Sequence, residues 1–248
     1  MYRFMTLVKR DMVNILKNPT LLISNLVITF VLTLILGFLS SGNYGRTGVD
    51  SYDYYGITML IFAVLNVAMT ASNSFMEKSL KTSNLRVIFS PIPKSYIYLS
   101  KIVATFAFTS VCLLLNTFLF NIVLQVNFGG ARILYVIALL LLFDLFSSIT
   151  GVMFCCIFKS EELSNRILSL VIDIFAILGG IFFQLDGFGD VLRKLTYISP
   201  VKWVVEAVFR IIYDNDLSLF IQPLLVLSVL SLVFLGVCKL TFKTEDYV

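Results

Sequence analysis

Six long apolar runs constrain this chain more than any other feature of its sequence. They cover Leu21–Leu39, Tyr55–Phe75, Tyr98–Val126, Ile133–Phe158, Ile167–Phe183 and Leu219–Phe242. A helix of about 20 residues crosses the hydrocarbon layer of a bilayer, so runs of this kind are typical of membrane spans. Charged residues make up only 14% of the 248, against about 25% in soluble domains. The sequence therefore predicts an all-α, polytopic membrane protein with six transmembrane helices.

The residue inventory argues against several functional classes. The formal charge of +4 gives no electrostatic support for nucleic-acid binding. The four cysteines lie inside apolar runs without metal-ligand spacing, and histidine is absent. The phosphate-binding pattern GxxxxGK[ST] does not occur, and no pair of carboxylates accompanies a base. We therefore expect no catalytic residues, no metal and no cofactor bound by the chain itself.

Lysine and arginine in the connecting segments predict the orientation of the spans. Thirteen of them fall on the side that carries both termini and the loops after the second and fourth spans, and six fall on the other side. Cytoplasmic loops carry the excess of such residues in membrane proteins. We therefore expect a multi-pass protein of a bacterial cell membrane with both termini in the cytoplasm.

Two segments differ from plain spans. Residues 1–20 form a basic amphipathic stretch, with Arg3, Arg10 and Lys17 on one helical face, which is typical of a helix at the membrane interface that contacts lipid. The rest, residues 21–248, form the transmembrane domain. Within it, residues 184–217 contain apolar residues at helical spacing, interrupted by glycines and Pro200. A pair of short helices that dips into the outer leaflet accounts for this pattern.

Polar residues inside the apolar runs are candidates for a translocation path. Ionisable residues within spans are uncommon and often functional. The candidates are two carboxylates and a polar stripe on the second span: Asp144, Asp173, Asn66, Thr70 and Asn73. Small and polar residues also hold membrane helices together, so packing is the alternative for each carboxylate. We expect that one of the two carboxylates meets a cationic or amphiphilic substrate.

The loop after the second span, residues 77–97, predicts a contact with a soluble partner. It is basic, has an apolar helical face, and ends at a corner that contains Pro91 and Pro93. Proline stops a helix and fixes the direction of the chain. A solvated linker would need neither the apolar face nor the proline corner.

Together these segments resemble the permeases of ABC type 2 transporters. The first part of the resemblance is Glu77-Lys78, Leu80, Leu85, Phe89-Ser90-Pro91-Ile92 and Leu99-Ser100-Lys101. The second part is Gly179-Gly180-Ile181-Phe182-Phe183, then Ser199-Pro200, Trp203, Glu206-Ala207 and Arg210. The order and spacing of the two parts, with the amphipathic amino-terminal helix, extend the resemblance over nearly the whole chain. No large outer domain is inserted, as in the short drug, peptide-antibiotic or sodium exporters.

The resemblance implies a transmembrane subunit of an ATP-binding-cassette exporter. Two permease protomers, identical or paralogous, would pair, and two separate ATPase subunits would bind ATP and Mg²⁺. Residues 1–20 would be the connecting helix and the loop a coupling helix that contacts the ATPases through Glu77, Lys78, Leu80, Lys81, Leu85, Arg86, Phe89 and Pro91. Residues 184–217 would be an outer re-entrant hairpin marked by Gly179, Gly180, Pro200, Trp203, Glu206 and Arg210. A stand-alone secondary transporter or channel, or an immunity or scaffold protein, remains the alternative.

Overall fold

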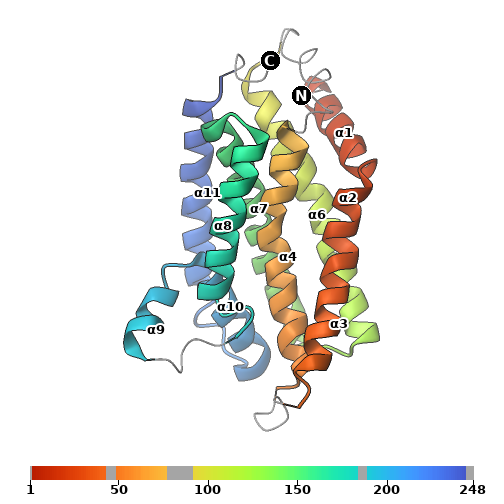
Figure 1. Ribbon diagram of the computed structural model, residues 1–248, viewed down its shortest axis with the longest axis vertical. Coiled ribbons are helices and arrows are strands. Elements are labelled where there is room, and N and C mark those ends of the chain that lie inside the picture. Colours follow the sequence, from red (N-terminus) through yellow and green to blue (C-terminus); the bar gives the residue numbers. More distant parts are fainter. Residues whose placement is uncertain (1, 43–48, 77–91, 184–188, 244–248) are drawn as a thin grey trace.

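All the regular elements in the described part of the chain are helices. The computed structural model describes residues 2–42, 49–76, 92–183 and 189–243. The bundle consists of α1 (Tyr2–Leu16), α2 (Pro19–Leu22), η1 (Ile23–Ile28), α3 (Thr29–Leu39), α4 (Ser51–Met76), α6 (Ser95–Val123), α7 (Ile133–Phe158), α8 (Glu161–Leu178) and α11 (Ile221–Thr241). The beginning of α1 and the end of α11 lie at the same end of the bundle (Figure 1), called here the terminal end.

Helix α4 is the central helix of the bundle. It packs against α7, α3, α6, α8 and α10 (Pro200–Phe209), and most of its length is buried. Its approach to α7 is especially close, because a Cβ added at Gly151 of α7 would lie 2.0 Å from the Ala68 carbonyl oxygen. Small residues permit such close backbone contact between membrane helices. The α4–α7 contact therefore fixes the centre around which the other helices pack.

The first span contains a segment of π-helix that the sequence did not indicate. Helices α2, η1 and α3 follow one another without a break over Pro19–Leu39, and η1 makes i→i+5 hydrogen bonds. Its Asn25 carbonyl oxygen accepts a hydrogen bond of 2.8 Å from the Asn116 side chain of α6. A side chain of a neighbouring helix thus satisfies a carbonyl of the wider π turn.

Five helical segments in the described ranges are long and apolar enough to cross a membrane. They are Pro19–Leu39, Ser51–Met76, Ser95–Val123, Gly130–Phe158 and Ile221–Thr241. They match five of the six expected spans to within a few residues.

The remaining expected span, Ile167–Phe183, corresponds to α8 with shifted ends. The Ser160 side chain caps the amino terminus, and Glu161 and Glu162 occupy the first turn, so the helix begins earlier than its apolar run. It ends at Leu178, before the positive φ of +74° at Gly180. Helix α8 lies beside α4 and α7 (Figure 1), yet its charged residues set it apart from the five apolar segments. A sixth crossing stays a prediction.

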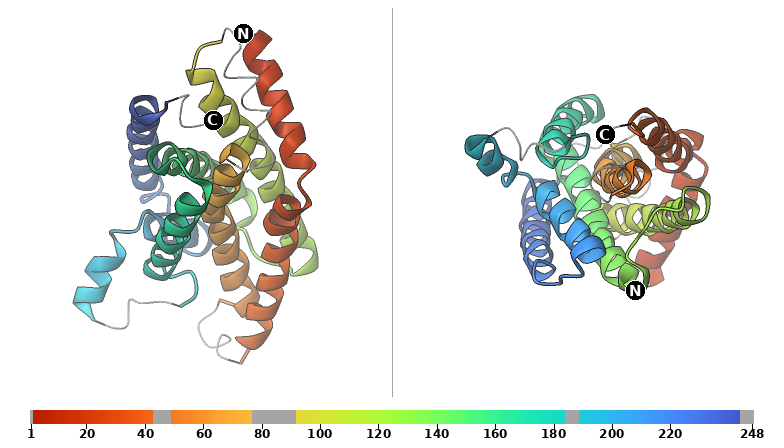
Figure 2. Two further views of the ribbon diagram at one scale, coloured as in Figure 1. Left: turned by 45° about the horizontal axis from the view of Figure 1, so that its top comes forward. Right: turned by 90° about the horizontal axis from the view of Figure 1, so that it is seen from below.

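Short helices occupy the described part of the expected outer hairpin. They are α9 (Asp190–Thr196), α10 and η5 (Arg210–Asp214), all at the end opposite the terminal end (Figure 2). Ser199 caps α10 by accepting a hydrogen bond from the Val201 backbone N–H, and Pro200 occupies the first turn. The entry of these helices into the bilayer stays a prediction.

The close α4–α7 contact makes a testable prediction. We expect Gly151→Ala to force the two helices apart and to lower the free energy of unfolding by about 1–3 kcal/mol, as overpacking does elsewhere. The measurement is the apparent melting temperature of the purified protein in detergent. Gly236→Ala in α11 is the control, because a Cβ there has no neighbouring atom within 4 Å. Equal melting temperatures for the two variants would contradict the assigned packing.

Candidate functional site: a polar groove beside the central helix

A groove of about 310 Å³ lies between the first span and α4. From the first span it is lined by Thr20, Leu21, Ser24, Asn25, Ile28, Thr29 and Leu32, and from α4 by Met59, Phe62, Ala63, Asn66, Met69, Thr70 and Asn73. The structure thus brings together the three predicted path residues of the second span. The described lining contains amide, hydroxyl, aromatic and thioether side chains and no charged one. Such a wall suits a solute with both polar and apolar parts.

Asn25 joins the two sides of the groove, and sequence reasoning missed it. Its amide nitrogen donates to the Thr70 hydroxyl oxygen at 3.0 Å and to the Leu21 carbonyl oxygen at 2.8 Å. Asn25 lies within η1, so the π-helical segment carries this contact with the α4 stripe. The sequence did carry a signal for Asn25, an amide in the middle of an apolar run. It carries no signal for the π-helical segment.

Helix α8 extends the polar surface of the groove on the other side of α4. The Asn165 side chain donates to the Asn73 side-chain oxygen at 2.7 Å and accepts from the Ser72 hydroxyl at 2.6 Å. Ser169 and Asp173 follow Asn165 at spacings of four and eight residues, so they continue the same face of α8. Asp173 is exposed, and Figure 2 shows α4 between α8 and the first span. The residues that line the groove belong to the first span and α4, and Asp173 lies outside this lining, on a helix that contacts α4.

The other predicted carboxylate, Asp144, lies elsewhere. It is fully buried between α6 and α7, where its two oxygens accept hydrogen bonds from the Thr109 hydroxyl at 2.7 Å and the Ser110 hydroxyl at 2.9 Å. The structure does not bring it together with Asp173 or with the α4 stripe. Its contacts favour the packing alternative, since they connect α6 to α7.

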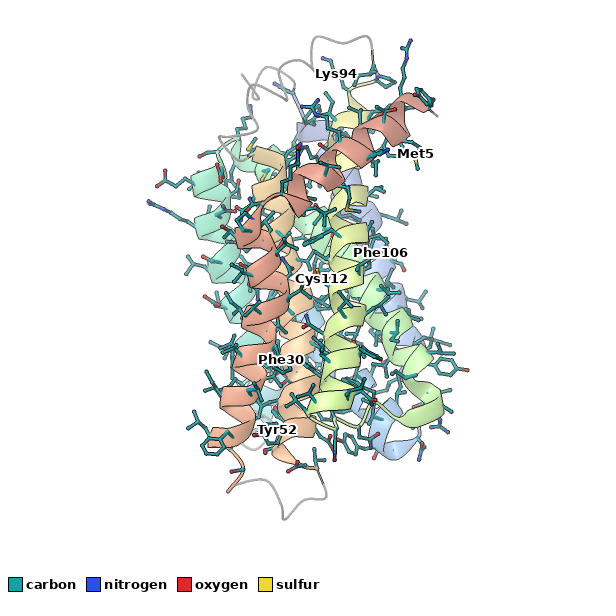
Figure 3. All side chains as sticks on the ribbon, turned by 90° about the vertical axis from the view of Figure 1, so that its right-hand side faces the viewer. Met5, Phe30, Tyr52, Lys94, Phe106 and Cys112 are labelled. Carbon is teal, nitrogen blue, oxygen red and sulfur yellow. The ribbon has the colours of Figure 1, made fainter. Side chains whose placement is uncertain are left out.

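Helix α1 is attached to α6 by a buried ion pair. Asp11 accepts a hydrogen bond from the Ser100 hydroxyl at 2.8 Å, and the Lys101 ammonium nitrogen lies 2.9 Å from its other oxygen. Both charged side chains are less than a tenth exposed. Figure 3 shows α1 crossing the terminal end of α6 at an angle, with Met5 pointing away from the bundle. The pair fixes α1 and α6 to each other.

Sequence reasoning named different residues on this helix. Arg3 and Lys17 are exposed and Arg10 is partly buried. Asp11 was overlooked, although a signal was present: it lies between Val8 and Ile15 on the apolar face. The predicted coupling residues Glu77, Lys78, Leu80, Lys81, Leu85, Arg86, Phe89 and Pro91 lie outside the described residues.

The predicted hairpin residues gather at the opposite end of the bundle. A second cavity, of about 540 Å³, is lined by Gly179, Gly180, Glu206 and Arg210, among others. Glu206 connects the group: it pairs with Arg210 at 3.1 Å and accepts a hydrogen bond from the Tyr197 hydroxyl at 2.9 Å. Trp203 lies beside this group and donates to the Tyr197 carbonyl oxygen, and Pro200 begins α10.

Glycines 179 and 180 follow α8 and contact its neighbours. A Cβ at Gly179 would lie 2.4 Å from a methyl carbon of Val201, so the backbone after α8 packs directly against the Val201 side chain of α10. Gly180 adopts a positive φ, and its carbonyl oxygen accepts a hydrogen bond of 2.7 Å from the Tyr54 hydroxyl of α4. The two glycines thus fix the end of α8 against α4 and α10.

Two titratable groups in and after η5 have pKa values shifted from their ordinary range. Burial, followed by the nearby Asp53 carboxylate, raises the pKa of the Tyr213 phenol, which donates to Asp53 at 3.0 Å. Hydrogen bonds from the Ser218 hydroxyl and backbone N–H lower the pKa of the exposed Asp216 carboxyl. Tyr213 therefore stays a neutral donor that connects η5 to α4 at neutral pH.

Comparison with known proteins gives one clear result. The family model described as "ABC-2 type transporter" matches residues 2–213, which is most of the chain. The match includes α1, the groove, the ion pair and the hairpin helices. No individual curated protein matches the chain.

The buried ion pair between α1 and α6 generates the second prediction. Removing one partner leaves an unpaired buried charge, so we expect Asp11→Leu or Lys101→Met alone to lower the free energy of unfolding by about 3–5 kcal/mol. The double variant removes both charges, and we expect it to regain most of that loss. Melting temperatures of the four proteins in detergent form the double-mutant cycle. Additive effects of the two substitutions would show that the charges do not interact.

Proposed function

The chain belongs to the ABC-2 type transporter family, whose members are membrane components of ABC transporters, and we propose that it is the permease subunit of an exporter. In this proposal two permease protomers form the path, and two separate ATPase subunits supply the work through binding and hydrolysis of ATP. The path alternates between access from the inner and the outer side of the membrane.

The observation that carries this proposal is the groove beside α4. Its polar side chains and the exposed Asp173 contrast with the large apolar side chains that are exposed on α6 and α11, such as Phe118, Ile122 and Leu232. Lipid offers no hydrogen-bond partners, so polar groups on a membrane protein face other protein or water. A second protomer placed against this face would enclose both grooves in one polar path. The proposed path therefore lies between protomers.

The ion pair between α1 and α6 supports the proposed coupling to an ATPase. Residues 77–97 precede and enter α6, so movement of the proposed coupling loop would pull on α6 directly. Because Lys101 is paired with Asp11, α1 would move with it. The connecting helix and the coupling loop would then respond to the ATPase as one unit. Differential binding of ATP to the closed state supplies the free energy of that movement.

The orientation in the proposal follows from charge. Thirteen of the 19 lysines and arginines fall in the amino-terminal segment, the loops after the second and fourth spans and the carboxy-terminal segment. The beginning of α1 and the end of α11 lie at the terminal end (Figure 1). We place this end in the cytoplasm, where the ATPases would dock. Helices α9 and α10 then lie at the outer leaflet.

The proposed pairing is tested by crosslinking. The four native cysteines are buried, so Asn66→Cys introduces a reactive thiol in the groove. We expect a short bismaleimide to link two Asn66→Cys protomers in native membranes, visible as a dimer on denaturing gels. Leu232→Cys is the control, because Leu232 lies on the exposed outer face of α11 and is 70% exposed. A dimer only with Leu232→Cys would place the interface elsewhere.

The proposed dependence on an ATPase is tested by co-purification. We expect the full chain, tagged and purified from its own cell membrane, to bring down a separate ATPase whose rate of ATP hydrolysis depends on the chain. The same membranes, made into vesicles, should lose transport when ATP hydrolysis is blocked. Full transport without any ATPase would favour a stand-alone secondary transporter or channel and would overturn the proposal.

A further inference from the structure

Asp173 is an exposed carboxylate at a level between the two ends of the bundle. Two contacts with α4 fix its depth: Asn165 bonds to Asn73 near the terminal end, and the Gly180 carbonyl bonds to Tyr54 near the opposite end. Asp173 lies eight residues beyond Asn165, which is about 12 Å along a helix. Since α8 runs antiparallel to α4, this places Asp173 close to the depth of Asn66, near the middle of α4.

The neighbours of α8 show which way Asp173 faces. The Ser164 hydroxyl donates to the Phe154 carbonyl oxygen of α7, and the Ser199 hydroxyl before α10 donates to the Phe175 carbonyl oxygen. These contacts cover one flank of α8. Asn165 contacts α4 on the other flank, and Asp173 lies on the same side, farther from α7. The carboxylate is therefore turned away from α7, on the flank of α8 that continues from Asn165.

The charge of Asp173 has no counterpart on this face. Arg166, the one lysine or arginine of α8, pairs with Glu162 at 2.5 Å. The first span over Pro19–Leu39 and α4 over Ser51–Met76 contain neither lysine nor arginine. Lys101 is buried in its pair with Asp11. A second copy of the same face would therefore bring another Asp173 and no unpaired cation.

At the level of this carboxylate, the groove has an apolar and aromatic surface. Met59, Phe62 and Met69 of α4 are part of its lining, interleaved with Asn66 and Asn73. Thioether side chains adapt to irregular apolar shapes, and an aromatic ring attracts a cation. The neighbourhood thus combines one negative charge with a surface for an apolar body.

We propose that the groove binds cationic amphiphiles, with the cationic group near Asp173 and the apolar body against Met59, Phe62 and Met69. This assignment rests on the proposed function in one respect, that the groove is part of a water-accessible path. It gives the exporter a substrate class: hydrophobic molecules or peptides with a positive charge. Neutral molecules of the same shape bind less tightly because they gain no attraction from the Asp173 carboxylate, and anionic molecules are repelled by it.

The test uses two ions of nearly equal shape and opposite charge, tetraphenylphosphonium and tetraphenylborate. Binding of each to the purified full chain in neutral-lipid nanodiscs is measured by equilibrium dialysis, with empty nanodiscs subtracted. We expect the wild-type chain to bind the phosphonium at least tenfold more tightly than the borate. We expect Asp173→Asn to weaken phosphonium binding by about tenfold, which is 1.4 kcal/mol, and Asp173→Glu to retain it.

Several outcomes would overturn the assignment. Equal binding of the two ions by the wild-type chain would do so without any variant, and so would unchanged phosphonium binding by a folded Asp173→Asn protein. The measurement uses the permease alone, so it is independent of the ATPase. Failure to recover an ATPase would remove the proposed function and leave this binding result standing, whereas loss of charge selectivity would remove only the substrate class.

Discussion

Polar side chains inside an apolar bundle need partners, because hydrocarbon offers none. In this protein those partnerships define the arrangement of the helices. Ser74 contacts Thr105 across α4 and α6, Ser72 donates to Asn165 across α4 and α8, and Asn25 connects η1 to Thr70. Thr109 and Ser110 hold Asp144 between α6 and α7. These polar residues thus lie at helix contacts, and Asn66, Thr70 and Asn73 line the groove.

The same constraint explains why the two carboxylates of the spans differ. Asp144 and Asp173 look alike in the sequence, since each lies in an apolar run beside small and polar residues. In the structure Asp144 has two hydroxyl donors and no exposure, whereas Asp173 is exposed on α8. The first connects two helices, and the second is available to a solute. Only the packing of neighbouring helices distinguishes them.

The buried pair of Asp11 and Lys101 gives the terminal end a fixed geometry. A buried ion pair contributes little net stability, yet breaking it is costly, so it favours one alignment of the two helices. Here it aligns a helix that precedes the first span with the beginning of the third. In the proposed exporter this is the region that would receive the movement of the ATPases. Rigidity there would pass that movement on to α6 and the helices that it contacts.

Sequence reasoning succeeded where the signal is local. The apolar runs predicted the five long helical segments, the alternating basic and apolar residues predicted α1, and interrupted helical spacing predicted short helices in the region of α9 and α10. It located the α4 stripe because Asn66, Thr70 and Asn73 recur at helical spacing on one face. It placed both ends of α8 too late, because its capping serine and first-turn glutamates are polar and lie outside the apolar run.

The sequence by itself determined the class of the protein, its helical content, the stripe on α4 and the family resemblance, since composition and periodicity are properties of single segments. Tertiary structure decided which polar residues face one another. The π-helical widening at Asn25, the pairing of Asp11 with Lys101 and the different surroundings of Asp144 and Asp173 depend on residues distant in the chain. The physical reason is the same in each case. A polar group in a bilayer needs a hydrogen-bonding or charged partner, and only the packing of the helices brings that partner close.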